Sequence, residues 1–163
     1  MEERRTGQVT GGAPVSVHFV NNVLAAAASY IEDDPELARD VLADLGSFLS
    51  HRLRGPRTVP MADELEHVAV YLRLEQARFP GRIVAELPAV REPPARRVEP
   101  GDVQAPISEA VGRWLTRDPG RVRLALRVGA DAVALQLDRP DAPGQPGERV
   151  RIPLGLRATG SAA

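Results

Sequence analysis

The segment Asp34-Pro35-Glu36 most constrains the fold, because it ends one helix and starts the next with almost no chain between them. Asp caps helices well, Pro suits the first turn, and an acidic residue there complements the positive end of the helix dipole. Apolar residues recur at helical spacing on both sides of this segment: Val15, Phe19, Val23, Ala26 and Tyr30 before it, and Leu37, Val41, Leu45, Phe48 and Leu49 after it. Residues 14–56 are therefore expected to form an antiparallel helical hairpin.

The composition excludes several kinds of chemistry. The chain of 163 residues has the length of one domain or two small ones. All 21 of its basic residues are arginine, so Lys-dependent chemistry is excluded, and the absence of Cys excludes disulfides and thiolate chemistry. A net charge of −1 gives no electrostatic reason to expect nucleic acid or an anionic membrane as a partner.

Metal binding and membrane insertion are not expected either. His18, His51 and His67 fall on separate expected elements without the paired spacing of zinc ligands. No apolar run approaches about 18 residues, so no membrane span is expected. Residues 1–7 carry no apolar signal segment. We therefore expect a soluble, cytoplasmic protein without a metal site.

The rest of the chain predicts a helical half followed by a small α+β half. Apolar periodicity predicts helices over 62–78 and 103–116, and alternation predicts strands over 122–128 and 132–137. Shorter strands are expected over 82–87 and 150–154, with proline-rich loops over 88–101 and 139–148. The ends, 1–13 and 158–163, are expected to be a flexible arm and a tail.

His18 is the residue that most invites a chemical role. It lies on the stripe next to the apolar face of the first helix, with Asn22 one turn further on. A histidine placed there reaches solvent and can accept a proton or a phosphoryl group. The alternative is an exposed helical histidine without any function.

Three segments of the chain resemble the LytS/YehU-type sensor histidine kinases. Residues 17–22, VHFVNN, are similar to the family's Pro-His-Phe-x-x-Asn block, with Val17 at the position of the proline. Residues 45–55, LGSFLSHRLRG, are similar to its second helix. Residues 59–79 hold its Glu-Leu, Tyr-Leu and Arg-Phe pairs at matching spacing. The likeness covers residues 14–87 and has the three blocks in the family's order.

The resemblance implies an α+β fold in which the helical hairpin is followed, over residues 57–157, by a third helix and a small, truncated ATPase-like α/β sandwich. It implies that His18 is the phosphoacceptor and that Asn22 is the motif asparagine. It also implies a homodimer, in which two hairpins bury their apolar faces as a four-helix bundle. The implied partner is a response regulator or a partner kinase.

The second half departs from the family's pattern. The family's nucleotide-binding block is matched by residues 105–111, in which Glu109 is retained but Ala110 stands at the position of the metal-binding asparagine. Asp138-Arg139-Pro140 stands where an Asp-x-Gly-x-Gly motif is expected. The candidate cofactor-binding residues are therefore Glu109 and Asp138, in a degenerate site at which binding of ATP and Mg²⁺ is not expected.

Three functions follow from this comparison. The first is a phosphorelay protein that acts through His18 as a phosphotransfer or pseudokinase dimer. The second is an active ATP-dependent histidine autokinase with an unusual nucleotide site. The third is a regulatory binding module in which His18 is inert. ATP binding separates the second from the others, and phosphoryl transfer to His18 separates the first from the third.

Overall fold

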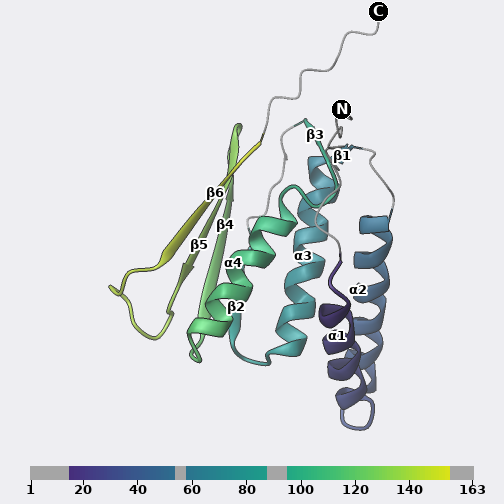
Figure 1. The fold of residues 1–163 in the computed structure, drawn as a ribbon. Coiled ribbons are helices and arrows are strands. Elements are labelled where there is room, and N and C mark those ends of the chain that lie inside the picture. The colour runs from purple at the N-terminus through teal and green to yellow at the C-terminus, as the bar shows by residue number, and fades with distance from the viewer. Residues whose placement is uncertain (1–14, 54–57, 88–94, 155–163) are drawn as a thin grey trace, which may run out of the picture.

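The fold has three layers, which a computed structural model describes for residues 15–53, 58–87 and 95–154. Helices α1 (Val17–Tyr30) and α2 (Pro35–Leu53) form a hairpin. Helices α3 (Met61–Arg78) and α4 (Gln104–Arg117) lie between this hairpin and a sheet (Figure 1). The α+β class and the helical hairpin predicted from the sequence are confirmed. Within the described ranges, no helix combines the length and apolarity needed to cross a bilayer.

The hairpin follows from two side-chain caps. Ser16 Oγ accepts a hydrogen bond from the Phe19 amide, so α1 begins at Val17. Asp34 Oδ1 accepts from the Leu37 amide, 3.0 Å away, and starts α2 as expected. Helix α1 ends at Tyr30, before the break predicted at Asp34, and the predicted end of the hairpin at residue 56 lies outside the described residues.

Helix α3 is the centre of the molecule, because the hairpin packs on one side of it while α4 and the sheet half lie on the other (Figure 1). Its sequence is apolar on more than one face, as a helix covered on both sides requires. The buried residues of α3 are Met61, Glu64, His67, Val68, Val70, Tyr71, Leu72, Leu74, Glu75 and Ala77. One continuous apolar core runs from Val23 in the hairpin through Tyr71 to Leu135 in the sheet.

The sheet has the order β2-β4-β5-β6. Strand β2 (Ile83–Glu86) pairs parallel to β4 (Val122–Val128), and β5 (Ala132–Asp138) and β6 (Glu148–Pro153) add antiparallel. The alternation predicted for β4 and β5 is observed: Val122, Leu124 and Leu126 are buried, whereas the residues between them lie on the other face of the sheet.

A second, two-stranded sheet was not predicted. Strand β1 (Val59–Pro60) pairs antiparallel with β3 (Arg97–Val98), and the Met61 amide donates to Arg96 O. Strand β3 falls in the segment 88–101, which was predicted to be a loop, and no strand was predicted at β1. A strand of two residues is too short to show an alternation of apolar and polar residues, and its partner strand lies almost forty positions away in the chain.

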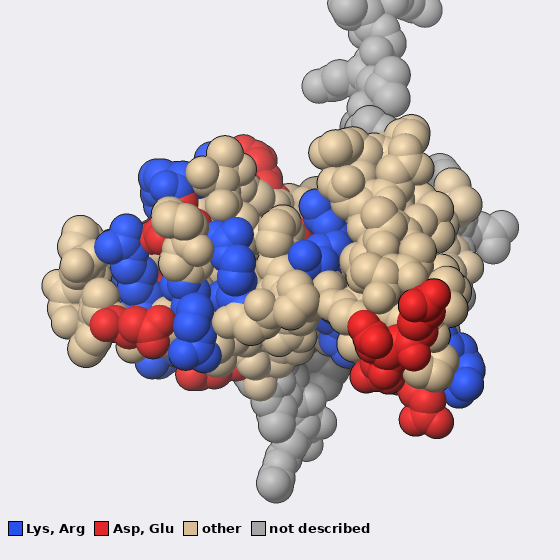
Figure 2. Space-filling view, turned by 90° about the horizontal axis from the view of Figure 1, so that it is seen from below, with Lys and Arg blue, Asp and Glu red and all other residues tan. Residues whose placement is uncertain are grey.

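Charge is distributed unevenly over the molecule. Seen from below, acidic side chains gather over the tip of the hairpin and arginines over the sheet half (Figure 2). The hairpin tip carries four exposed acidic residues, Glu32, Asp33, Asp34 and Glu36. The net charge of −1 is thus the sum of an acidic end and an arginine-rich end.

Candidate functional site

His18 lies in the first turn of α1 and is exposed. Asn22 follows one helical turn later, and its Nδ2 lies 3.1 Å from His18 Nε2. Because an amide nitrogen only donates, this contact favours the neutral tautomer with the proton on Nδ1 and a lone pair on Nε2. The sequence therefore placed these two residues together correctly, while their chemical roles remain a prediction.

The helix that carries His18 is fixed to α3 at both ends. At its start, the Phe19 ring lies 5.3 Å from the Phe48 ring and 5.9 Å from the Tyr71 ring, centroid to centroid. At its end, the Tyr30 hydroxyl donates to Ala77 O over 2.7 Å. Val23 is fully buried between these two anchors. His18 is therefore an exposed side chain on a helix whose opposite face is held firmly.

Glu64 connects three helices. It is fully buried. Its carboxylate accepts hydrogen bonds of 3.0 Å from the backbone amides of Gly101, Val103 and Gln104, at the start of α4. His51 Nε2 of α2 lies 3.0 Å from the same carboxylate. A carboxylate at a helix N-terminus is stabilised by the unpaired amides there. Glu64 thus positions α2 and α4 against α3.

The two remaining histidines form a ring stack beside Glu64. His67 lies between Phe48 and His51, with centroid distances of 4.7 and 4.0 Å. Burial, with smaller contributions from His51 and Arg52, lowers the pKa of His67 to about 3. Its Nε2 is buried without a hydrogen-bond partner in the described structure. His67 is therefore neutral at pH 7 and serves packing.

A metal site is not indicated by this cluster. Across the described ranges, no group of three or more His, Cys, Asp and Glu side chains is arranged to hold a metal ion. His51 and His67 stack face to face rather than converging on one point.

The two residues predicted for cofactor binding lie on different sides of the sheet. Glu109 is on α4, which covers one face, and it is exposed and paired with Arg113 over 2.6 Å. Asp138 ends β5 next to the buried Leu137, so it lies on the opposite face, where it accepts two hydrogen bonds from Arg123. The structure therefore does not bring Glu109 and Asp138 together around one ligand.

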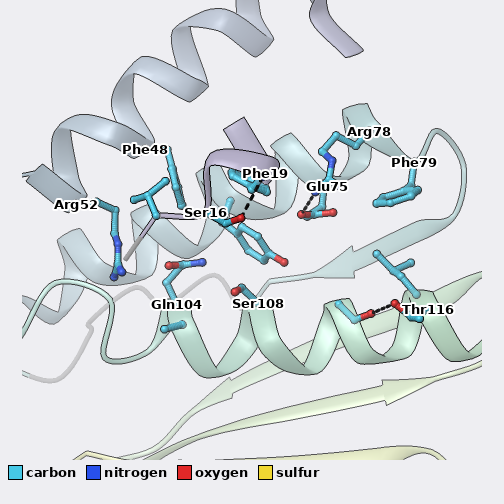
Figure 3. A pocket seen from close by; sticks show the side chains of 15 residues that line it. Ser16, Phe19, Phe48, Arg52, Glu75, Arg78, Phe79, Gln104, Ser108 and Thr116 are labelled. Atoms are coloured by element: carbon cyan, nitrogen blue, oxygen red, sulfur yellow. Dashed lines mark hydrogen bonds and ion pairs between the residues drawn. The ribbon is translucent and has the colours of Figure 1, made fainter. Parts of the chain in front are cut away.

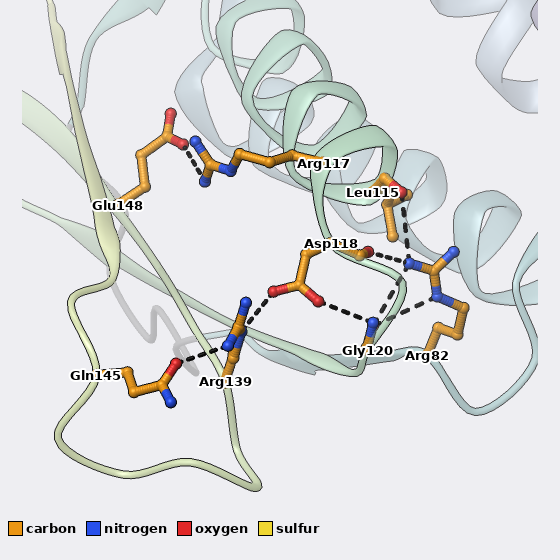
Figure 4. Close-up of polar contacts among 8 residues, drawn as sticks. All are labelled: Arg82, Leu115, Arg117, Asp118, Gly120, Arg139, Gln145 and Glu148. Carbon is orange, nitrogen blue, oxygen red and sulfur yellow. Dashed lines mark hydrogen bonds and ion pairs between the residues drawn. The ribbon is translucent and has the colours of Figure 1, made fainter.

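The groove between the end of α4 and the β5–β6 connection has a volume of about 710 Å³. Arg139, directly after Asp138, lies in this groove and donates to Asp118 (Figure 4). A backbone hydrogen bond from Gly120, and then the Arg139 guanidinium, lower the pKa of Asp118. Asp118 is therefore an ionised partner that holds the loop after β5 against α4.

A second set of ion pairs crosses the same groove. Glu148 at the start of β6 pairs with Arg113, at a distance of 2.9 Å. It also pairs with Arg117, 3.4 Å away (Figure 4). Ala110, at the position predicted to lack a metal ligand, is fully buried. These pairs were not predicted from the sequence. Glu148 lies 31 to 35 residues from these arginines in the chain, so no local pattern indicates the pairs.

The outer face of the hairpin carries apolar residues without a partner in the described structure. Val17 and Leu24 of α1 and Ile31, the C-cap of α1, are 73%, 44% and 59% exposed and follow one another at intervals of seven residues. On α2, Leu42 and Leu53 are 47% and 78% exposed. A seven-residue apolar repeat is typical of a helix that packs against another helix.

Comparison with known proteins relates this geometry to one family. A sequence profile described as histidine kinase matches residues 13–83. The chain is 29% identical to the sensor histidine kinase BtsS of Escherichia coli K12 over 129 residues, which are 77% of this chain and 23% of the relative. It is 32% identical to the sensor protein LytS of Enterococcus faecalis over 101 residues, 61% of this chain and 17% of the relative.

A further relative is the sensor protein LytS of Bacillus subtilis, 38% identical over 77 residues, which are 46% of this chain and 13% of that protein. The chain thus spans less than a quarter of the length of these relatives. The profile match includes His18, Asn22 and Glu64.

Proposed function

We propose that the chain is a two-component signalling protein whose His18 exchanges a phosphoryl group with a partner, because residues 13–83 match a histidine kinase profile and the chain is similar to sensor proteins of the LytS and BtsS type. The relationship supports the general signalling role. The finer points are that His18 is the acceptor, that the working form is a dimer, and that the chain does not use ATP itself.

The observation that carries the proposal is the placement of His18. Its ring is exposed on a helix anchored by Phe19 and Tyr30, and Asn22 favours a lone pair on Nε2. In the transfer, the Nε2 lone pair would form a bond to phosphorus while the bond between phosphorus and the donor's leaving atom breaks. The leaving group takes that electron pair, and Asn22 Nδ2 must move aside as Nε2 attacks.

Dimerisation is supported by the outer face of the hairpin. Val17, Leu24 and Ile31 expose apolar surface at heptad spacing next to His18, and Leu42 and Leu53 extend it onto α2. A second copy of the hairpin would cover this surface by forming a four-helix bundle. The proposed partner of this dimer is a response regulator or a partner kinase that reaches His18 from the solvent side.

The second half supports a role without ATP. Glu109 and Asp138 lie on opposite sides of the sheet, and Ala110 has no ligand atom. Three arginines with their carboxylate partners line the groove beside α4, which leaves no set of unpaired acidic oxygens for Mg²⁺ among the described groove residues. These residues do not fit an ATP–Mg²⁺ complex.

The experiment is titration calorimetry of the full chain with ATP and Mg²⁺. We expect no saturable heat of binding at millimolar nucleotide. Saturable binding, together with incorporation of label from ATP that is lost in His18→Gln, would instead support the alternative of an active autokinase. A regulatory module with inert His18 is the alternative that remains if no phosphoryl donor labels His18.

A further inference from the structure

A cavity of about 480 Å³ lies between the hairpin and α4, apart from the groove beside the sheet. It is bordered by the first turn of α1, the end of α2, the buried side of α3 and the outer side of α4 (Figure 3). Its volume is within the range of small-molecule sites, which is about 300–1,000 Å³.

One wall of the cavity is apolar. Phe19 of α1, Phe48 of α2 and Tyr71 of α3 meet there as an aromatic cluster, with ring centroids 5.3 to 6.4 Å apart. Phe79 and Leu115 extend the apolar lining toward the other end. This wall suits a flat aromatic or aliphatic body.

The opposite wall carries polar groups aimed into the cavity. Gln104 is only 4% exposed, yet its side-chain amide makes no hydrogen bond to any described residue. Its backbone amide is bound by Glu64, which fixes its position at the start of α4. Figure 3 shows Gln104 and Ser108 rising from α4 toward α1. The side-chain amide of Gln104 can therefore donate to, or accept from, a group inside the cavity.

The charges at the cavity favour an anion. Among the described residues that line it, Arg52 and Arg78 are basic and Glu75 is acidic, and Glu75 lies 2.7 Å from Arg78. The Arg52 guanidinium lies against Gly101, whose φ of +94° and lack of a side chain leave room for it. It donates to Pro100 O and thus stands close to the start of α4, where Gln104 begins the helix.

We propose that this cavity binds a small organic anion, with its acidic group held by Arg52 and Gln104 and its apolar body against Phe19, Phe48 and Tyr71. Ser16 and Phe19 line the cavity on either side of His18 in the sequence, and Ser16 caps α1. A bound ligand would therefore stabilise the turn that carries His18. The cavity would make the position of the candidate phosphoacceptor depend on a metabolite-sized anion.

Gly112 offers a substitution that closes the cavity without disturbing the fold. It lines the cavity inside α4, and a Cβ built on it meets nothing within 4 Å. Gly112→Leu would extend a side chain into the cavity, and leucine favours helix more than glycine does. Gly112→Ala is the matched control, because it gives the helix preference with little loss of volume.

The test uses the fluorescence of 8-anilinonaphthalene-1-sulfonate, an aromatic anion, with neutral N-phenyl-1-naphthylamine as its uncharged counterpart. We expect saturable binding of the anion to the wild type and to Gly112→Ala, and at least tenfold weaker binding to Gly112→Leu. In Arg52→Gln, we expect the affinity for the neutral dye to fall less than the affinity for the anion. Urea unfolding of each variant shows that the fold is retained.

Three results would overturn the proposal. The first is that the anion does not bind the wild type saturably. The second is that it binds Gly112→Leu as tightly as the wild type. The third is that Leu24→Glu, and not Gly112→Leu, loses binding, which would place the dye on the outer face of the hairpin. Dye binding is measured without any phosphoryl donor, so it fails or succeeds independently of the phosphotransfer role. As a second readout, saturating anion should shift the NMR signal of the His18 ring in Gly112→Ala and leave it unchanged in Gly112→Leu.

Discussion

At the residue scale, Glu64 is the buried charged side chain that joins α2, α3 and α4. Its buried carboxylate accepts hydrogen bonds from three backbone amides and lies against His51. Glu64→Gln keeps the shape but replaces one acceptor oxygen with a donor group that faces these amides. We expect the free energy of unfolding in urea to fall by about 3 kcal/mol.

Glu66→Gln is the matched control, because Glu66 is an exposed glutamate on the same helix. We expect it to change the free energy of unfolding by less than about 0.5 kcal/mol. Equal effects of the two substitutions would show that the contacts of Glu64 do not stabilise the fold.

His67 predicts a specific dependence of stability on pH. Since burial lowers its folded-state pKa to about 3, while the unfolded value is near 6.5, the unfolded chain takes up this proton first as pH falls. The stability that neutral His67 contributes is therefore fully present above pH 6.5 and is lost progressively as the pH falls toward 3. Between pH 7 and pH 5 the contribution of His67 to the free energy of unfolding should fall by about 2 kcal/mol.

The measurement is urea unfolding of wild type and His67→Phe at pH 7 and pH 5. Phenylalanine retains a ring between Phe48 and His51 but does not titrate. Between pH 7 and pH 5, the free energy of unfolding of the variant should fall by about 2 kcal/mol less than that of the wild type. The same loss in both proteins would mean that His67 does not carry the effect.

The residues of the candidate site differed in how well the sequence could predict them. His18 and Asn22 are four residues apart on one helix, so helix geometry alone brings their side chains together. Glu64 meets amides 37 to 40 residues away, and Glu148 meets Arg117 across 31 residues. Such contacts depend on how elements pack, which local spacing does not encode.

At the element scale, the start of α2 rests on the cap at Asp34. Its Oδ1 accepts from the Leu37 amide over 3.0 Å, and Pro35 begins the helix. Asp34→Ala removes this acceptor and should lower the free energy of unfolding by about 1 kcal/mol. Asp33→Ala, in the same turn but outside the helix, is the control, and a loss as large as that of Asp34→Ala would contradict the capping role.

The regular elements were predicted well, and the reason is their length. The strand 122–128 and the helix 62–78 matched β4 and α3 within a residue, because each repeats its pattern over several positions. Strands β1 and β3 have two residues each and show no pattern. The pairing that joins them is visible only once α3 and α4 are in place.

At the scale of the whole molecule, the outer face of the hairpin predicts self-association. Leu24→Glu places a charge in the centre of the α1 repeat, so it should shift the chain from dimer to monomer in analytical ultracentrifugation, with at least a tenfold weaker association. Leu87→Glu is the control, since Leu87 is similarly exposed, at 40% against 44%, but lies after β2. A monomeric wild type, or equal effects of the two variants, would exclude this dimer interface.

The central claim is that His18 accepts a phosphoryl group although the chain does not use ATP. The direct measurement is mass spectrometry of the intact chain, with site mapping, after exposure either to ATP and Mg²⁺ or to phosphoramidate, a small phosphoryl donor to histidine. The account predicts one phosphoryl group on His18 from phosphoramidate and none from ATP. It also predicts no modification of His18→Gln and unchanged modification of His18 in the control His51→Gln. Labelling of His18 from ATP alone, or no labelling of His18 from either donor, would contradict it.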